Sequence, residues 1–74
     1  MFLNGTYTAT IQQLQHVDIH GTRYIDITYI LDGQSAAQSA RVGSDDVRGN
    51  PQPGDSVQIT FVLNVITGVQ RATA

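Results

Sequence analysis

Two apolar stretches that meet at a two-residue turn limit this chain to β-structure more than any other feature of the sequence. Every second residue of the stretch 25–31 is apolar, which is the pattern of a strand with one face over a core. Residues 7–11 alternate in the same way. After them the phase slips once, and one extra residue at 12–13 would restore it, as a β-bulge does. The pattern predicts a hairpin of two long strands that turns at His20-Gly21.

The turn at 20–21 also sets the register of this hairpin. A two-residue loop needs positive φ at both positions, which glycine accepts freely and histidine accepts better than most residues. The register places Asp18 opposite Arg23 as an opposite-charge pair, and it places Leu14 opposite Ile27. With the bulge included, the apolar residues of both strands fall on one face: Tyr7, Ala9, Ile11, Leu14, Ile25, Ile27, Tyr29 and Leu31.

The rest of the chain reads as three more strands and one helical turn. The Asp-Gly pair at 32–33 is a strong hairpin signal, and it predicts a turn that leads into a strand over 35–42. This strand is rich in alanine, so we expect it to lie at the edge of the sheet or to be covered by another segment. Residues 44–47 fit one helical turn, with its serine as cap and two aspartates at its start. Further strands are predicted over 55–63 and 66–72. One face of the first of these carries four apolar residues: Val57, Ile59, Phe61 and Leu63.

Composition agrees with an all-β domain. The chain has 74 residues, and we expect one domain over 1–74. All its acids are aspartate and all its bases are arginine, so the helix-favouring lysine and glutamate are both missing. Cysteine is absent, so disulfide bonds cannot stabilise the fold. A domain this small then depends on its core alone, on a metal, or on self-association.

The order of elements predicts a small five-stranded barrel of OB-like type, with an SH3-like barrel as the alternative. Within that order, the stretches GTRYIDITYILDG and PQPGDSVQITFVLNVITG are similar in layout to small phage single-stranded-DNA-binding proteins. Those proteins also place a Gly-x-x-Tyr before a hairpin strand, here Gly21 to Tyr24, and a Pro-Gly turn before a late strand, here Pro53-Gly54. They carry several lysines, whereas this chain has none. The resemblance implies an OB-type barrel and single-stranded nucleic acid as a ligand.

The opposite face of the second strand carries the candidate site. A two-residue turn at 32–33 would place Tyr24 opposite Arg41 and Asp26 opposite Ser39. Strands two and three of an OB barrel present the oligonucleotide surface, where an aromatic ring stacks on bases and arginine contacts phosphate. The same residues could instead form an ordinary cross-strand pair or a contact with a second subunit. The candidate residues for nucleic-acid or partner binding are Arg23, Tyr24, Asp26, Ile30, Arg41 and Arg71.

Self-association is the function that this sequence favours first, as a non-catalytic binding or interaction module. The chain is small and sparsely charged, and its predicted outer faces carry more apolar area than a lone barrel should expose. Pairing of two copies through one shared surface would cover that area, so we expect a homodimer or a higher closed oligomer. The outer apolar residues are Val17, Tyr24, Ile30 and Val62. Single-stranded nucleic-acid binding is the alternative, although the net charge of −2 provides no broad basic surface.

Other classes of function find little support in the sequence. The chain lacks Cys, Lys and Glu, and no glycine-rich phosphate loop is present, so we expect neither an enzyme nor a bound cofactor. His16, Asp18 and His20 alternate along one strand, but a flat strand separates the first and last by about 13 Å, too far for one metal ion. The first residues resemble no signal peptide, and no stretch has the length of a membrane span. The default expectation is a cytoplasmic protein.

Overall fold

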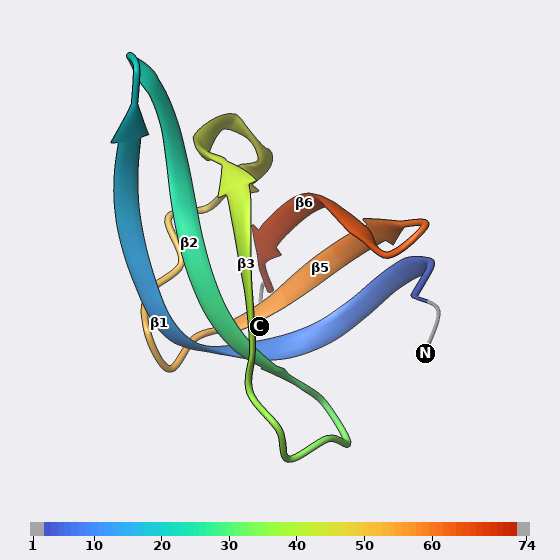
Figure 1. Cartoon of the computed structure of the whole chain (residues 1–74). Helices are drawn as coiled ribbons and strands as arrows, with labels where there is room; N and C mark the ends of the chain where they lie inside the picture. Colours follow the sequence, from blue (N-terminus) through green and yellow to red (C-terminus); the bar gives the residue numbers. More distant parts are fainter. Residues whose placement is uncertain (1–2, 73–74) are drawn as a thin grey trace.

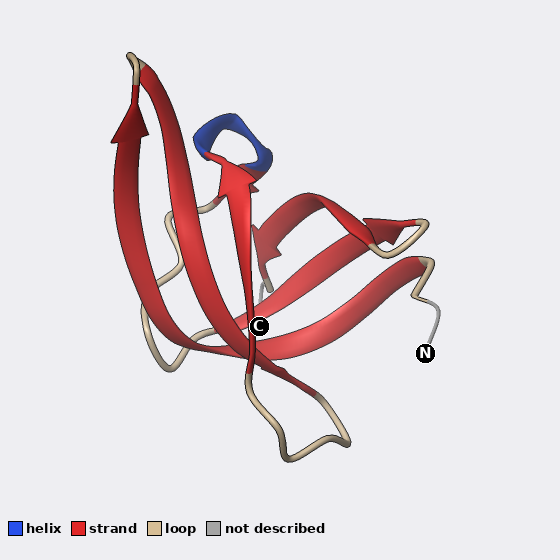
Figure 2. Cartoon of the chain, in the orientation of Figure 1, coloured by secondary structure: helices blue, strands red, loops and turns tan. Residues whose placement is uncertain are grey.

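Strands dominate the computed structural model, which describes residues 3–72 (Figure 2). Within that range the elements are, in chain order, β1 (Gly5–Ile19), β2 (Thr22–Leu31), β3 (Gln38–Gly43), the 3-10 helix η1 (Ser44–Asp46), β4 (Val47–Arg48), β5 (Ser56–Val62) and β6 (Val65–Arg71). The strands form one sheet in the order β3-β2-β1-β5-β6-β4, which curls strongly into a half-barrel (Figure 1). The predicted all-β, barrel-like class is confirmed. Nowhere in residues 3–72 is there a helix with the length and apolar character needed to cross a membrane.

The β1–β2 hairpin has the predicted geometry. His20 and Gly21 form its turn with φ of 51° and 82°. Asp18 lies opposite Arg23, and the register shifts once immediately after Ile11, at the predicted bulge. Because β1 is long and bends, its residues 5–10 pair with β5 and its residues 9–19 pair with β2 (Figure 1). The tip of this hairpin therefore projects beyond the curled part of the sheet.

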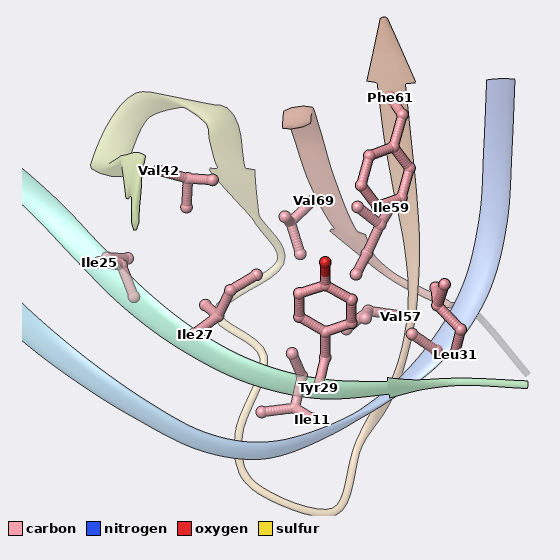
Figure 3. Packing of buried hydrophobic residues seen from close by; sticks show 11 residues of the cluster. Ile11, Ile25, Ile27, Tyr29, Leu31, Val42, Val57, Ile59, Phe61 and Val69 are labelled. Atoms are coloured by element: carbon pink, nitrogen blue, oxygen red, sulfur yellow. The ribbon is translucent and has the colours of Figure 1, made fainter. Parts of the chain in front are cut away.

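The core fills the concave side of the curled sheet. Ile11, Ile27 and Ile59 are fully buried, together with Val57 and Val69. Eleven residues make up the buried cluster: Ala9, Ile11, Ile25, Ile27, Tyr29, Leu31, Val42, Val57, Ile59, Phe61 and Val69 (Figure 3). These include six of the eight apolar residues predicted for the inner face of the first two strands, and the other two are half-buried and pack against them.

The prediction for the register of β3 is wrong by two residues. A turn forms at 32–33, but pairing between β2 and β3 begins only at Gln38, so Tyr24 faces Gly43 and not Arg41. In the predicted register Val42, the largest apolar residue of the strand, would face an arginine. The observed shift brings Val42 opposite Ile25 in the core, and the longer loop costs little because closure entropy grows slowly with loop length. β3 lies at the edge of the sheet order, as predicted.

The second half of the chain differs from prediction mainly at its turns. η1 forms where a helical turn is predicted, but Gly43 is its N-cap and no side-chain cap bond is made. The two-residue β4 adds a short strand that the sequence does not predict. β5 ends at Val62, and Leu63 and Asn64 form the next turn with φ of 51° and 69°. Leu63 is therefore exposed, although its alternation with Phe61 predicts a core position.

The Tyr29 side chain points from β2 into the buried cluster (Figure 3). Its ionisation makes the stability of the fold depend on pH in the alkaline range. Burial raises the pKa of Tyr29 above its ordinary value of 10.0. The unfolded chain therefore loses this proton first, so the stability linked to the neutral phenol is fully present below about pH 10 and is lost as the pH rises through the higher pKa of the folded state. Phenylalanine has no proton to lose, so we expect Tyr29→Phe to lose less stability than wild type as the pH rises. The measurement is the melting temperature of both proteins between about pH 8 and about pH 11. Parallel curves for variant and wild type would contradict this.

Candidate binding surface

The convex side of β1, β2 and β3 holds most of the predicted site residues. Along β2, Tyr24, Asp26, Thr28 and Ile30 alternate with four buried residues and are each half-buried. Their direct partners on the two neighbouring strands are short, polar or aliphatic residues, apart from one arginine. We call this surface the outer face, and it consists of Thr10, Gln13, Gln15, Val17, Tyr24, Asp26, Thr28, Ile30, Ser39 and Arg41.

A bidentate ion pair lies at the centre of the outer face. Arg41 Nε donates to Asp26 Oδ1 at 2.7 Å, and Arg41 Nη2 donates to Asp26 Oδ2 at 3.0 Å. Direct opposition of the two residues across β2 and β3 makes this geometry possible. The hydrogen bond from the guanidinium holds the pKa of Asp26 below its ordinary value, and the same bond raises the pKa of Arg41. Both side chains remain accessible, with exposed fractions of 49% for Arg41 and 36% for Asp26.

Tyr24 packs differently from the sequence prediction. Its direct partner on β1 is Val17, an aromatic–β-branched pair of the kind that stabilises sheets, and its partner on β3 is Gly43. Glycine has no side chain to cover the ring from that strand. Arg41 is the diagonal neighbour of Tyr24, at a spacing that long and aromatic side chains can span. An aromatic ring and a guanidinium thus share the outer face without being directly opposite.

Two of the predicted site residues, Arg23 and Arg71, do not lie on the outer face. Arg23 is opposite Asp18 on the other side of β2, although it lines the same open hollow of about 560 Å³ as Tyr24, beside the β1–β2 hairpin. Arg71 is on β6, where its Nε lies 3.6 Å from Asp55 Oδ2. The sequence pattern places Tyr24 and Arg41 on one face of the sheet, and so does the structure. Side chains alternate between the two faces of a strand, so a register shift of two residues leaves each side chain on its predicted face.

A second feature, at the turn between β5 and β6, is only partly predicted from the sequence. Val62, Leu63 and Val65 are exposed there, with fractions of 49%, 65% and 63%. Val62 and Val65 are direct cross-strand partners, so the three side chains gather at one hairpin end. We call this the hairpin-tip patch. The sequence assigns only Val62 to an outer face, because the position of the turn depends on contacts from residues far away in the chain.

Those distant contacts come from the segment that precedes β1. The backbone N–H of Leu63 donates to Asn4 Oδ1 at 3.2 Å. The backbone N–H of Asn64 donates to the backbone carbonyl of Leu3 at 2.8 Å. The chain start therefore holds the hairpin tip in place by hydrogen bonds to its two turn residues.

Metal-ligating side chains do not cluster in the described part of the chain. Residues 3–72 contain no group of three or more His, Cys, Asp or Glu side chains placed to hold one ion. No charged residue in that range is buried. Of the two ion pairs described within residues 3–72, Asp26–Arg41 is the closer and the one with two hydrogen bonds, and it lies on the outer face.

Comparison with family models, curated proteins and solved structures finds no match to this chain. No relative therefore supplies a function that could be carried over. The outer face and the hairpin-tip patch are interpreted from their own side chains.

Proposed function

We propose that the chain is a non-catalytic β-barrel binding module that self-associates through the hairpin-tip patch. The observation that carries this is the exposure of Val62, Leu63 and Val65, which are about half or more open to solvent in one copy. Apolar side chains scattered singly are normal on the surface of a monomer, whereas apolar side chains gathered in one patch are typical of interaction sites. A second copy placed over the patch would cover the same residues on both subunits.

The energetics of such a contact are favourable for a module this small. Full burial of one Val or Leu side chain contributes about 1.5–3 kcal/mol, and a symmetric contact buries each residue twice. Part of that gain is offset by the loss of translational and rotational freedom on association. The low number of charges on the chain leaves little repulsion to oppose the approach of two copies.

Leu63→Asp tests this contact without disturbing the turn. Leu63 has a φ of 51°, a conformation that aspartate tolerates better than leucine, so the variant should fold. We expect wild type to sediment as a dimer or a larger closed oligomer at micromolar concentration, and the variant as a monomer, because a charge cannot be buried unpaired in the contact. Gln70→Asp is the matched control, since it adds the same charge at an exposed site on β6. Wild type that sediments as a monomer would contradict the proposal.

The barrel is proposed to be of OB type, and the strand order supports this. β1, β2 and β3 follow one another as neighbours, and β5 returns to lie beside β1, which gives the Greek-key order β5-β1-β2-β3. OB barrels are small, partly open Greek-key barrels, so this order favours them over the SH3-like alternative. β4, which follows η1, runs parallel to β6 at the far edge of the sheet and begins to close the curl.

Single-stranded nucleic acid is the second candidate ligand, and the outer face is the observation that favours it. In an OB barrel the surface of strands two and three binds oligonucleotides, and here those strands carry Tyr24 and Arg41 as diagonal neighbours. Hydroxyls follow along the same face, where Thr28 Oγ1 and Ser39 Oγ lie 3.1 Å apart. Because the net charge is −2, affinity must come from base stacking more than from phosphate attraction.

A further inference from the structure

Arg41, the arginine of the outer face, is already occupied in the free protein. The edge of its guanidinium formed by Nε and Nη2, one of the edges that can bind a phosphate through two hydrogen bonds, is engaged by the two oxygens of Asp26. A carboxylate and a phosphate present the same kind of acceptor pair to a guanidinium, so the two compete for one set of donors. We propose that Asp26 is an internal competitor for Arg41, and that a nucleic-acid phosphate takes the Nε–Nη2 edge of the guanidinium only by displacing it. This inference rests on the single-stranded nucleic-acid binding proposed above.

The side chains around the pair offer neither partner an alternative charge. Residues of β1, β2 and β3 contribute to this shell as direct or diagonal neighbours of Asp26 and Arg41. They are Gln13, Gln15, Val17, Tyr24, Thr28 and Ser39. None of these carries a charge at neutral pH, so the carboxylate neutralises the guanidinium one to one.

The pair is accessible enough to be opened by a ligand. About half of the Arg41 side chain is exposed, and more than a third of Asp26 is exposed as well. Exposed ion pairs contribute little net stability, because water and salt screen them, so exchange of the carboxylate for a phosphate is not forbidden. The exchange gives no net gain in charge contacts, however. A bare polyanion therefore gains little from this face, whereas a strand with unpaired bases also gains stacking on Tyr24.

Salt dependence separates this competition from a structural role. Each phosphate that a protein neutralises releases counterions and steepens the plot of log affinity against log salt by about 0.7 for a single strand. In wild type the displaced carboxylate stays beside the phosphate, so the site brings no net positive charge and little release. In Asp26→Asn the guanidinium keeps its full positive charge, so we expect the full counterion release for one phosphate. A change that merely loosened β2 and β3 would lower affinity and would leave this slope unchanged.

The test is titration of Asp26→Asn with oligothymidylate over a range of salt concentrations. Asp32→Asn is the matched control, since it removes the same charge from an exposed turn and no ion pair involves Asp32 within residues 3–72. We expect Asp26→Asn to bind about tenfold more tightly than the control, as one charge-assisted contact would give. We also expect its salt slope to be steeper than that of the control by about 0.7.

A second variant ties the gain to the arginine itself. Adding Arg41→Gln to Asp26→Asn leaves this position without net charge, as in the wild-type pair, so the tighter binding and the steeper slope should both disappear. If Asp26→Asn matches Asp32→Asn in affinity and slope while wild type still binds, the competition is overturned and the binding function stands. If neither wild type nor any variant binds at low salt, the nucleic-acid function itself is overturned.

Discussion

Ile27→Ala should destabilise the domain by about 2–5 kcal/mol, the loss typical of a fully buried isoleucine. Ile27 has no exposed surface, and it lies on β2 between Leu14 on β1 and Ala40 on β3, with a paired strand on each side. Truncation leaves a cavity there, because the neighbouring strands are fixed by their own hydrogen bonds and cannot close it. Proteins are typically stable by about 5–15 kcal/mol, so the loss is a large share of the total.

Ile30→Ala is the matched control for this prediction. It removes the same atoms from the same strand, but on the outer face, where Ile30 is only half-buried opposite Thr10. We expect a loss below about 1 kcal/mol there, since less apolar surface returns to water. Denaturant unfolding measures both variants, and a shifted midpoint at unchanged slope identifies a pure stability effect. Equal losses at the two positions would contradict the assignment of inner and outer faces.

The β1–β2 hairpin could be predicted from sequence because everything that fixes it is local. Alternation defines the inner face, and the turn at 20–21 defines the register. The register of β3 could not be obtained in this way. It follows from the contact of Val42 with Ile25 and from a loop that stays unpaired up to residue 37, and neither has a local signal.

The candidate site was predictable to the same degree. Parity along β2 and β3 places Tyr24, Asp26 and Arg41 on one face, whereas the ion pair between the last two depends on the register and has no signal of its own in the sequence. The hairpin-tip patch escapes prediction for a different reason. Its turn is held by hydrogen bonds to Leu3 and Asn4, and contacts between such distant residues leave no periodic trace in the sequence.

Tyr24→Ala should weaken binding of single-stranded oligothymidylate by about 1–3 kcal/mol, or roughly fivefold to 150-fold, because the outer face would lose its aromatic platform. The ring is the only aromatic side chain on that face as the structure describes it. Removing the ring also deletes the cross-strand contact with Val17, for which we expect a stability loss of about 0.2–1 kcal/mol. Affinity is therefore measured well below the melting temperature of the variant.

Tyr24→Phe separates stacking from hydrogen bonding by the phenol. Phenylalanine keeps the ring and its contact with Val17, so we expect its affinity to stay within about threefold of wild type. If Tyr24→Phe bound as weakly as Tyr24→Ala, the hydroxyl and not the ring would be the recognising group. Unchanged affinity in Tyr24→Ala would remove the outer face from the binding surface. In that case Tyr24 would serve only its pairing with Val17, and self-association through the hairpin-tip patch would remain as the function supported by an exposed surface.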